Sequence, residues 1–537
     1  MSDIENEINV MKELQNTADP VSSHGVHTPA VSGIKRPLRR LSKILGTAVI
    51  AAAFMVISLV SSGAVKAFAE TTDNPAEYYQ TIEKTNIEKQ IDALTKFYGM
   101  YLDNYKKSAK GLGAQVDLKA EFDSSIAASM GLNDLKSLKA TIISMQTDKK
   151  TNSLIHLFTN DKEFTSFSVL VDIEKELEYI LVPELSKAYL KLSLNPDYSG
   201  LGRSAMPITA KELAELLNNN PLTEDLLNKL LKKYAAIAVG EISDVSVAYE
   251  SVIAGSISTE QTQLTAKLDE KTLLTIAEKV LTAAESDKDL SDLFVKFKMG
   301  TEADYNKLIQ ETLKQIVNIP MAGPEETLYM NVWVDTDGNI TGRDFSDSAD
   351  SDSSILGYKT AKIGSDVGFT AWFNPDKEES LKLTGNLETE NDMTNGEVTL
   401  SYTDSDIQTR EEFNVKLEDV KYTFNGSNSY VNGKFLISGD SLPGMKIDVN
   451  CTGDSELQTM KLDFVQDGTQ LVSVTMDTKR LPYEDFELPS KTEKVYDIQT
   501  QLEEYLSSAN LVNYLKGINS KIDIKGINAI LEQIISG

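Results

Sequence analysis

Apolar and polar residues follow two different periods along this chain, and each period predicts a different secondary structure. Asn74 can cap a helix, and Pro75 suits its first position because the missing amide hydrogen would have no partner there. We expect this helix to end near residues 108–111. Apolar residues recur along it every three or four positions, which predicts one packed face: Ile87, Ile91, Leu94, Tyr98, Tyr101 and Tyr105.

From residue 114 the period changes to two, which is typical of strands with one buried face. Charged turns separate the alternating segments, and spacing of this regularity predicts an antiparallel meander. The expected strands of this first meander span residues 115–122, 138–146, 152–159, 165–173, 178–182 and 187–194.

A helical block follows the meander, and a second β-rich block follows the helices. Thr209 and Glu212 form a capping box, and Thr223 starts another helix. Residues 319–324 contain two prolines and a glycine, which marks a boundary. We expect helices near 271–284, 290–297, 301–317, 497–515 and 527–535, and strands at 261–269, 328–335, 367–373, 381–388, 397–402, 430–438, 445–450, 458–465 and 470–477.

These segments predict an α+β fold in which curved antiparallel β-sheets pack with helices, preceded by one transmembrane helix. Residues 70–318 form a first α+β lobe with a helix, a meander and a helical block. Residues 325–537 form a second, β-rich lobe with C-terminal helices. The pattern leaves open whether the lobes are two similar units or share one long sheet.

The N-terminal region places the rest of the chain outside the cytoplasm. Residues 44–65 carry no charge, and a helix of that length crosses a hydrocarbon core of roughly 30 Å. The basic residues just before it keep residues 1–43 in the cytoplasm, where they form a mostly disordered tail. We expect residues 44–66 to be a transmembrane helix or uncleaved signal anchor in the cell membrane. Alternatively, cleavage after Ala69, at Ala67-Phe68-Ala69, would release a secreted protein.

Composition narrows the chemistry available to the chain. It contains 53 Lys and Arg against 81 Asp and Glu, a formal net charge of −28. We expect no nucleic-acid partner, because phosphate contacts need a basic face. The single cysteine, Cys451, excludes an intrachain disulfide and a thiolate metal cluster. We also expect no cofactor.

One acidic segment indicates a candidate metal site. Residues 335–339, Asp-Thr-Asp-Gly-Asn, resemble the first half of a calcium loop, but Ser346 stands where such a loop has a bidentate Glu. More aspartates follow in a Ser-rich stretch. The alternative is an ordinary hairpin turn. The candidate calcium ligands are Asp335, Asp337, Asp344 and Asp347.

Enzyme signatures are sparse, and we expect the protein not to be an enzyme. Residues 439–442 match the short signature of one lipase and esterase class, but no histidine follows Ser441 to act as its base. A carboxylate-dependent hydrolase stays as an alternative, because glycoside hydrolysis needs only two suitably placed acids. Trp333 and Trp372 lie in alternating strands and are better explained as core residues than as a sugar platform.

Two short segments carry a resemblance to a known group. Asn74-Pro75-Ala76-Glu77-Tyr78-Tyr79 and residues 182–190, Val-Pro-Glu-Leu-Ser-Lys-Ala-Tyr-Leu, resemble uncharacterised exported or membrane-anchored proteins of Gram-positive anaerobes. That group implies no activity. In element order alone, long strands with helices also resemble the curved half-barrels of lipoprotein-carrier and lipid-binding proteins.

Three functions are compatible with these observations. The one we favour is a non-catalytic cell-surface ectodomain that binds an apolar or lipid-like envelope ligand or a protein partner, because sheets and amphipathic helices are present without catalytic motifs. A single-pass signalling protein with an extracellular sensor is the second. The carboxylate-dependent hydrolase is the third.

Overall fold

The computed structural model describes most of the chain after residue 73. The predicted tail and the predicted membrane segment 44–66 lie outside the described residues, as does the boundary at 319–324. Within the described part, no helix combines the length and apolar character needed to cross a bilayer. The described residues are 74–522 except 130–131, 195–209, 318–326, 349–353, 375–378, 405–408 and 425–428, together with 528 and 532.

Twenty strands of the described chain form one continuous sheet. Every ladder is antiparallel except the one between β20 and β6. From one edge to the middle the order is β20 (Val495–Asp497), β6 (Tyr189–Ser193), β5 (Leu177–Leu181), β4 (Lys162–Asp172), β3 (Lys150–Thr159), β2 (Ser137–Gln146), β1 (Leu112–Phe122), β19 (Thr469–Leu481), β18 (Leu457–Gln466) and β17 (Met445–Gly453). It continues with β16 (Tyr430–Gly439), β15 (Thr409–Thr423), β14 (Met393–Asp404), β13 (Glu379–Glu390), β12 (Asp366–Phe373), β11 (Ser354–Ile363), β10 (Ile340–Ser346), β9 (Leu328–Val334), β8 (Ile257–Leu268) and β7 (Val245–Ala254).

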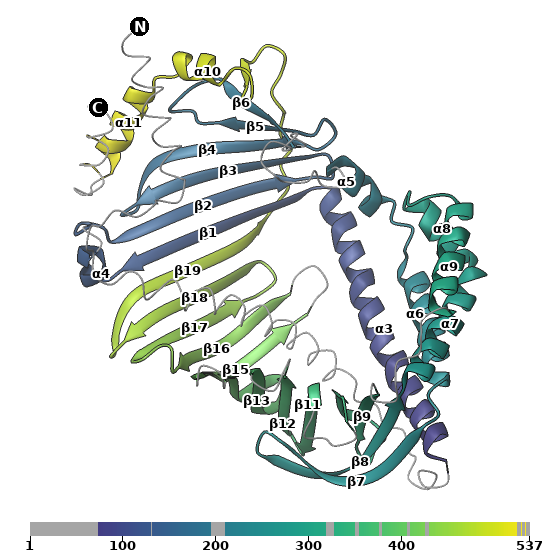
Figure 1. Ribbon diagram of the computed structural model, residues 1–537. Helices are drawn as coiled ribbons and strands as arrows, with labels where there is room; N and C mark the ends of the chain where they lie inside the picture. The colour runs from purple at the N-terminus through teal and green to yellow at the C-terminus, as the bar shows by residue number, and fades with distance from the viewer. Residues whose placement is uncertain are drawn as a thin grey trace, which may run out of the picture.

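The sheet bends into a broad arch, and helix α3 (Pro75–Ala109) runs across its concave side (Figure 1). A group of helices packs beyond α3, with α6 directly against it. The structure therefore confirms the α+β class and the curved sheet. The remaining helices are α4 (Ser124–Ser129), α5 (Ala210–Asn218), α6 (Glu224–Gly240), α7 (Glu270–Glu285), α8 (Lys288–Lys296), α9 (Glu302–Val317), α10 (Leu502–Ser508) and α11 (Leu511–Lys521).

Helix α3 begins where the sequence predicts. Asn74 caps it, with its side-chain oxygen accepting a hydrogen bond from the Glu77 amide at 3.3 Å, and Pro75 follows. The first turns then bury Tyr79 and Ile82 against the side chains of β8, β9 and β10. This contact forms the main hydrophobic core of the described chain. Its sheet members include Leu264, Ala266, Met330, Val332, Val334 and Ile340.

A buried ion pair fixes the helix to the same strands. Arg343 on β10 donates two hydrogen bonds to Glu83 on α3, at 2.7 and 2.8 Å, in a bidentate arrangement. Glu83 is 1% exposed, so the Arg343 guanidinium is the counter-charge that compensates the cost of burying the Glu83 carboxylate. One turn further along the helix, the Asn86 side chain accepts a hydrogen bond from the Ile340 amide at 3.4 Å.

The sheet closes on itself at the β7 edge, where the β7–β8 hairpin lies over β11 and β12. Trp333 is fully buried inside this roll, and its indole N–H donates to Glu250 at 2.7 Å. The Lys359 ammonium sits 3.9 Å from the Trp333 ring centroid. A glycine is required at Gly368, because a Cβ there would lie 1.9 Å from the Ala254 carbonyl oxygen.

The two lobes expected from the sequence join in one sheet, because β8 pairs with β9 and β1 pairs with β19. This settles the alternative that the sequence leaves open. The helix expected at 497–515 is two helices. Ala509 is extended and Asn510 caps α11, with its side chain accepting from the Asn513 amide at 3.0 Å.

We expect Glu83→Gln to lower the free energy of unfolding by about 3–5 kcal/mol, because it leaves the Arg343 charge buried without its partner. Urea unfolding of the full chain measures this. Glu311→Gln is the matched control, since Glu311 pairs with Lys307 at 3.8 Å between two exposed side chains. We expect it to change stability by less than about 0.5 kcal/mol. Equal losses in both variants would contradict the assigned role of the buried pair.

Candidate functional site

Cross-strand register shows that one face of the sheet is apolar over most of its width. Residues opposite each other in an antiparallel ladder point to the same side, and Val332 lies on the side that packs on α3. We call this side the concave face. From Val332, successive opposite residues on this face are Arg343, Tyr358, Ala371, Leu383, Leu400 and Phe413. Val415 lies on the same face of β15 as Phe413, and the path continues from it through Ile437, Ile447, Phe464, Val472 and Phe122. Val116 shares a face with Phe122 on β1, and the residues opposite it in turn are Ile142, Ile155 and Phe167.

The opposite, convex face carries charged pairs on several of the same strands. On β18, Lys461 and Asp463 alternate with the apolar concave residues and pair with each other at 2.8 Å. Asp117 on β1 forms an ion pair with Lys139 on β2, at 3.1 Å. A strand with one polar and one apolar face is expected to turn the apolar one away from water. The concave face is therefore the unusual one wherever it stays uncovered.

Within the described part of the chain, the concave side of β13–β18 has no hydrophobic cluster packed on it. Among the described residues, the buried hydrophobic clusters gather around α3 with β8–β10, around α4, around β20 with α10, and at the β7–β8 turn, and none takes a buried residue from β13–β18. Several large side chains of the concave face are exposed. Leu118 is 44%, Leu138 40% and Phe373 38% exposed. An apolar surface of this extent marks a binding site more often than an idle surface.

Helix α3 presents a single stripe of side chains toward this face. The stripe starts with Tyr79 and Glu83, which contact the sheet at β9 and β10. Its middle section is exposed, with Leu94 at 47%, Phe97 at 60% and Tyr101 at 54%. At this spacing all its members share one side of the helix: Tyr79, Glu83, Asn86, Leu94, Phe97, Tyr101, Asn104 and Ser108.

The helix is shorter than the stretch of sheet that it crosses. From Asn86 to Ser108 it advances about 33 Å at 1.5 Å per residue. Ten steps between neighbouring strands separate β10 from β1 through β11–β19, which is about 48 Å at 4.8 Å per step. The sheet must therefore bow away from the helix between the two contacts. This explains why the middle of the α3 stripe stays exposed above an apolar surface.

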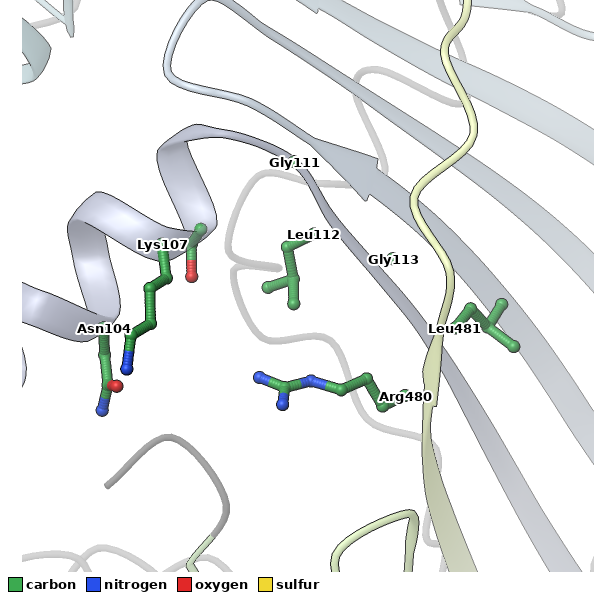
Figure 2. Close-up of a pocket in the computed structure, with 8 residues that line it drawn as sticks. Asn104, Lys107, Gly111, Leu112, Gly113, Arg480 and Leu481 are labelled. Carbon is green, nitrogen blue, oxygen red and sulfur yellow. The ribbon is translucent and has the colours of Figure 1, made fainter. Parts of the chain in front are cut away.

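A cavity of about 280 Å³ lies where the C-terminus of α3 meets β1 and β19. Figure 2 shows the side chains of Asn104, Lys107, Leu112 and Arg480 directed into the same space between helix and sheet, while Leu481 points away. No carboxylate lines the cavity among the described residues. Two cations and an apolar side chain thus converge at one end of the concave face.

The candidate calcium ligands are not brought together. The Asp335 carboxylate sits in the β9–β10 turn and accepts hydrogen bonds from the Asp337 and Asn339 amides, at 2.9 and 2.8 Å. Asp347 follows the far end of β10, roughly 20 Å away at 3.3 Å per residue. Asp344, between them, is 1% exposed and accepts a hydrogen bond from Asn331 at 2.8 Å. The described residues contain no group of three potential ligands placed to hold a metal.

Sequence reasoning did not single out Lys107 or Arg480. They lie far apart in the chain and meet only because β1 pairs with β19, with Ala114 opposite Arg480. A partial signal was available, because the apolar alternation of β19 ends at Thr478 and Arg480 on the concave side. This change from apolar to polar residues on the concave side of β19 indicates that the end of the strand near Arg480 is not buried.

We expect Asp344→Asn to stabilise the protein at pH 7 and to have little effect near pH 3. Burial raises the pKa of the Asp344 carboxyl above its ordinary value, more than the Asn331 hydrogen bond lowers it. As pH rises, the Asp344 carboxyl loses its proton in the unfolded chain, at a pKa of about 3.9, before it does so in the folded protein. The free energy of unfolding therefore falls between these two pKa values and stays at the lower value above the folded pKa. Urea unfolding at several pH values measures this difference.

The control for this pH dependence is Asp287→Asn, which should show the opposite sign. Burial raises the pKa of Asp287, but the hydrogen bonds from Lys233, Tyr234 and the Leu290 amide outweigh it and leave the pKa lowered. The stability from these contacts is present above the unfolded pKa and is lost as pH falls through the folded one. Parallel pH profiles for the two variants would refute the assignment for Asp344.

Comparisons with known proteins give no family for this chain. No family model matches it, and no curated protein matches it. Among solved structures, a mutant of the Rh. blastica porin and a chain described as "Asymmetric conductivity of engineered proteins" each have a TM-score of 0.20 and 6% identity. Each alignment covers 69% of this chain and 99% of the other. A likeness this low carries no argument about fold or function.

Proposed function

We propose that this protein is a non-catalytic cell-surface ectodomain that binds a lipid-like envelope ligand, with the alkyl chain of the ligand lying on the concave face beneath α3. The observation that carries the proposal is the apolar concave face of β13–β18, from which no hydrophobic cluster of the described residues takes a buried member. In this proposal residues 44–66 anchor the protein in the cell membrane, or cleavage after Ala69 releases it.

The physical case rests on two apolar surfaces that face each other. Leu94, Phe97 and Tyr101 of the α3 stripe are about half exposed or more, and on the concave side of the sheet Leu118, Leu138 and Phe373 are exposed as well. Removing both surfaces from water is favourable by roughly 25 cal/mol per Å². An alkyl chain can fill the space without needing hydrogen bonds, which apolar side chains cannot supply.

Direct contacts fix the position of α3 relative to the middle of the sheet. Phe97 stacks on Phe424, which follows β15, with ring centroids 6.3 Å apart, and Phe424 stacks on Tyr422 at 6.2 Å. Together with the Glu83–Arg343 ion pair, these contacts fix α3 before any ligand binds. A preformed site loses less conformational entropy on binding than one that must order itself.

We expect a photoactivatable lipid to label the concave face in living cells. Cells producing the full-length chain take up a fatty acid that carries a diazirine and an alkyne, and labelled peptides are identified by mass spectrometry after irradiation. Leu462→Gln puts a polar amide on the concave face and should lower labelling about tenfold.

The neighbouring residue supplies the control, because Lys461 lies on the convex face of the same strand. Lys461→Gln should leave the labelling unchanged. Labelling that is absent, or that is spread evenly over both faces, would refute the proposed function.

A further inference from the structure

Two cations line the cavity at the C-terminus of α3, in a protein that is strongly acidic overall. Lys107 comes from the last turn of the helix and Arg480 from the end of β19, and both side chains are exposed. Within the described part of the chain, Lys107 makes no ion pair. Figure 2 shows both side chains reaching into the same space. In a chain with a formal net charge of −28, two cations converge on this cavity, and none of the described residues that line it is a carboxylate.

The concave face changes from polar to apolar with distance from this cavity. On β19 it presents Arg480 and Thr478 first, and then Met476, Val474 and Val472, a run of about 27 Å at 3.4 Å per residue. The same order recurs on β2, two strands away, where Gln146 and Ser144 come first. Beyond them the concave residues of β2 are Ile142, Ala140 and Leu138.

This order of polarity matches that of an amphiphile with an anionic head. We propose that the cavity binds the phosphate head group of a lipid, with its alkyl chain extending over the concave residues of β19 and β1. This inference rests on the proposed function, and it adds the chemical class of the ligand and its orientation. The head group lies between α3 and the strand ends, and the chain points toward Val472 and Phe122.

The two cations suit a phosphate for different reasons. A guanidinium such as that of Arg480 can donate two parallel hydrogen bonds to phosphate oxygens, and an ammonium such as that of Lys107 supplies a point charge from the other side. Interactions between exposed charges weaken with salt, so binding of the head group should weaken as ionic strength rises.

The experiment compares two photoactivatable lipids that differ only in the phosphate. A lysophosphatidic acid and a monoacylglycerol, with the same diazirine-bearing chain, are each added to the full-length chain held in a non-ionic amphipol. We expect the phosphate lipid to label about tenfold more strongly at equal concentration. Lys107→Gln and Arg480→Gln should each reduce that labelling about tenfold and leave monoacylglycerol labelling unchanged.

Matched controls come from the neighbouring cations. Lys106 adjoins Lys107 but does not line the cavity, and Lys479 adjoins Arg480 on the convex face. Lys106→Gln and Lys479→Gln remove the same charge and should leave both lipids unaffected. Arg480→Lys should recover part of the preference for phosphate, and urea unfolding midpoints confirm that each variant is folded.

The outcomes separate this inference from the proposed function. Equal labelling by the two lipids, or equal losses in the control and cavity variants, would overturn the head-group site and leave the apolar binding face standing. Labelling of the concave face by neither lipid would overturn the proposed function and this inference with it. Inorganic phosphate that competes as well as the lysophosphatidic acid would overturn the lipid assignment, because the cavity would then bind free phosphate.

Discussion

The fold depends on a helix that is fastened at both ends to a sheet longer than itself. Glu83 and Arg343 join α3 to β10, and the last turn of α3 leads through Gly111 directly into β1. Because the sheet between these points is longer than the helix, it can only bow outward. The curvature, the exposed middle of the α3 stripe and the uncovered apolar face all follow from this mismatch.

The sequence predicts most strands and helices because alternation and capping are local properties. The Asn74 cap of α3 and the period-two segments of the first meander lie where they are expected. β15 was not predicted, because its register shifts between Glu418 and Lys421 and Asp419 adopts a positive φ of 52°, which interrupts the alternation. β7 was not predicted because it has apolar residues on both faces, with Val247 in the main core and Val252 in the roll.

The site is less predictable than the elements because it arises from register. Alternation in any one strand shows that it has an apolar face, but not that the apolar faces of neighbouring strands coincide. Trp333 was correctly expected in the core, yet its partners Glu250 and Lys359 come from strands that local patterns did not reveal. Lys107 and Arg480 likewise became neighbours only through the β1–β19 ladder.

That ladder also governs the order in which the chain can fold. The other long ladders join strands that are consecutive in the chain, with β8 and β9 separated only by a helical block. β1, near the start of the described chain, can form this ladder only once β19, near its end, is available to pair with it. Contacts between such distant segments form late, because closing a long loop costs conformational entropy before the contact can form. Until β19 has been synthesised, β1 keeps one edge unpaired and its apolar side chains in water, where a partly made chain is most prone to aggregate.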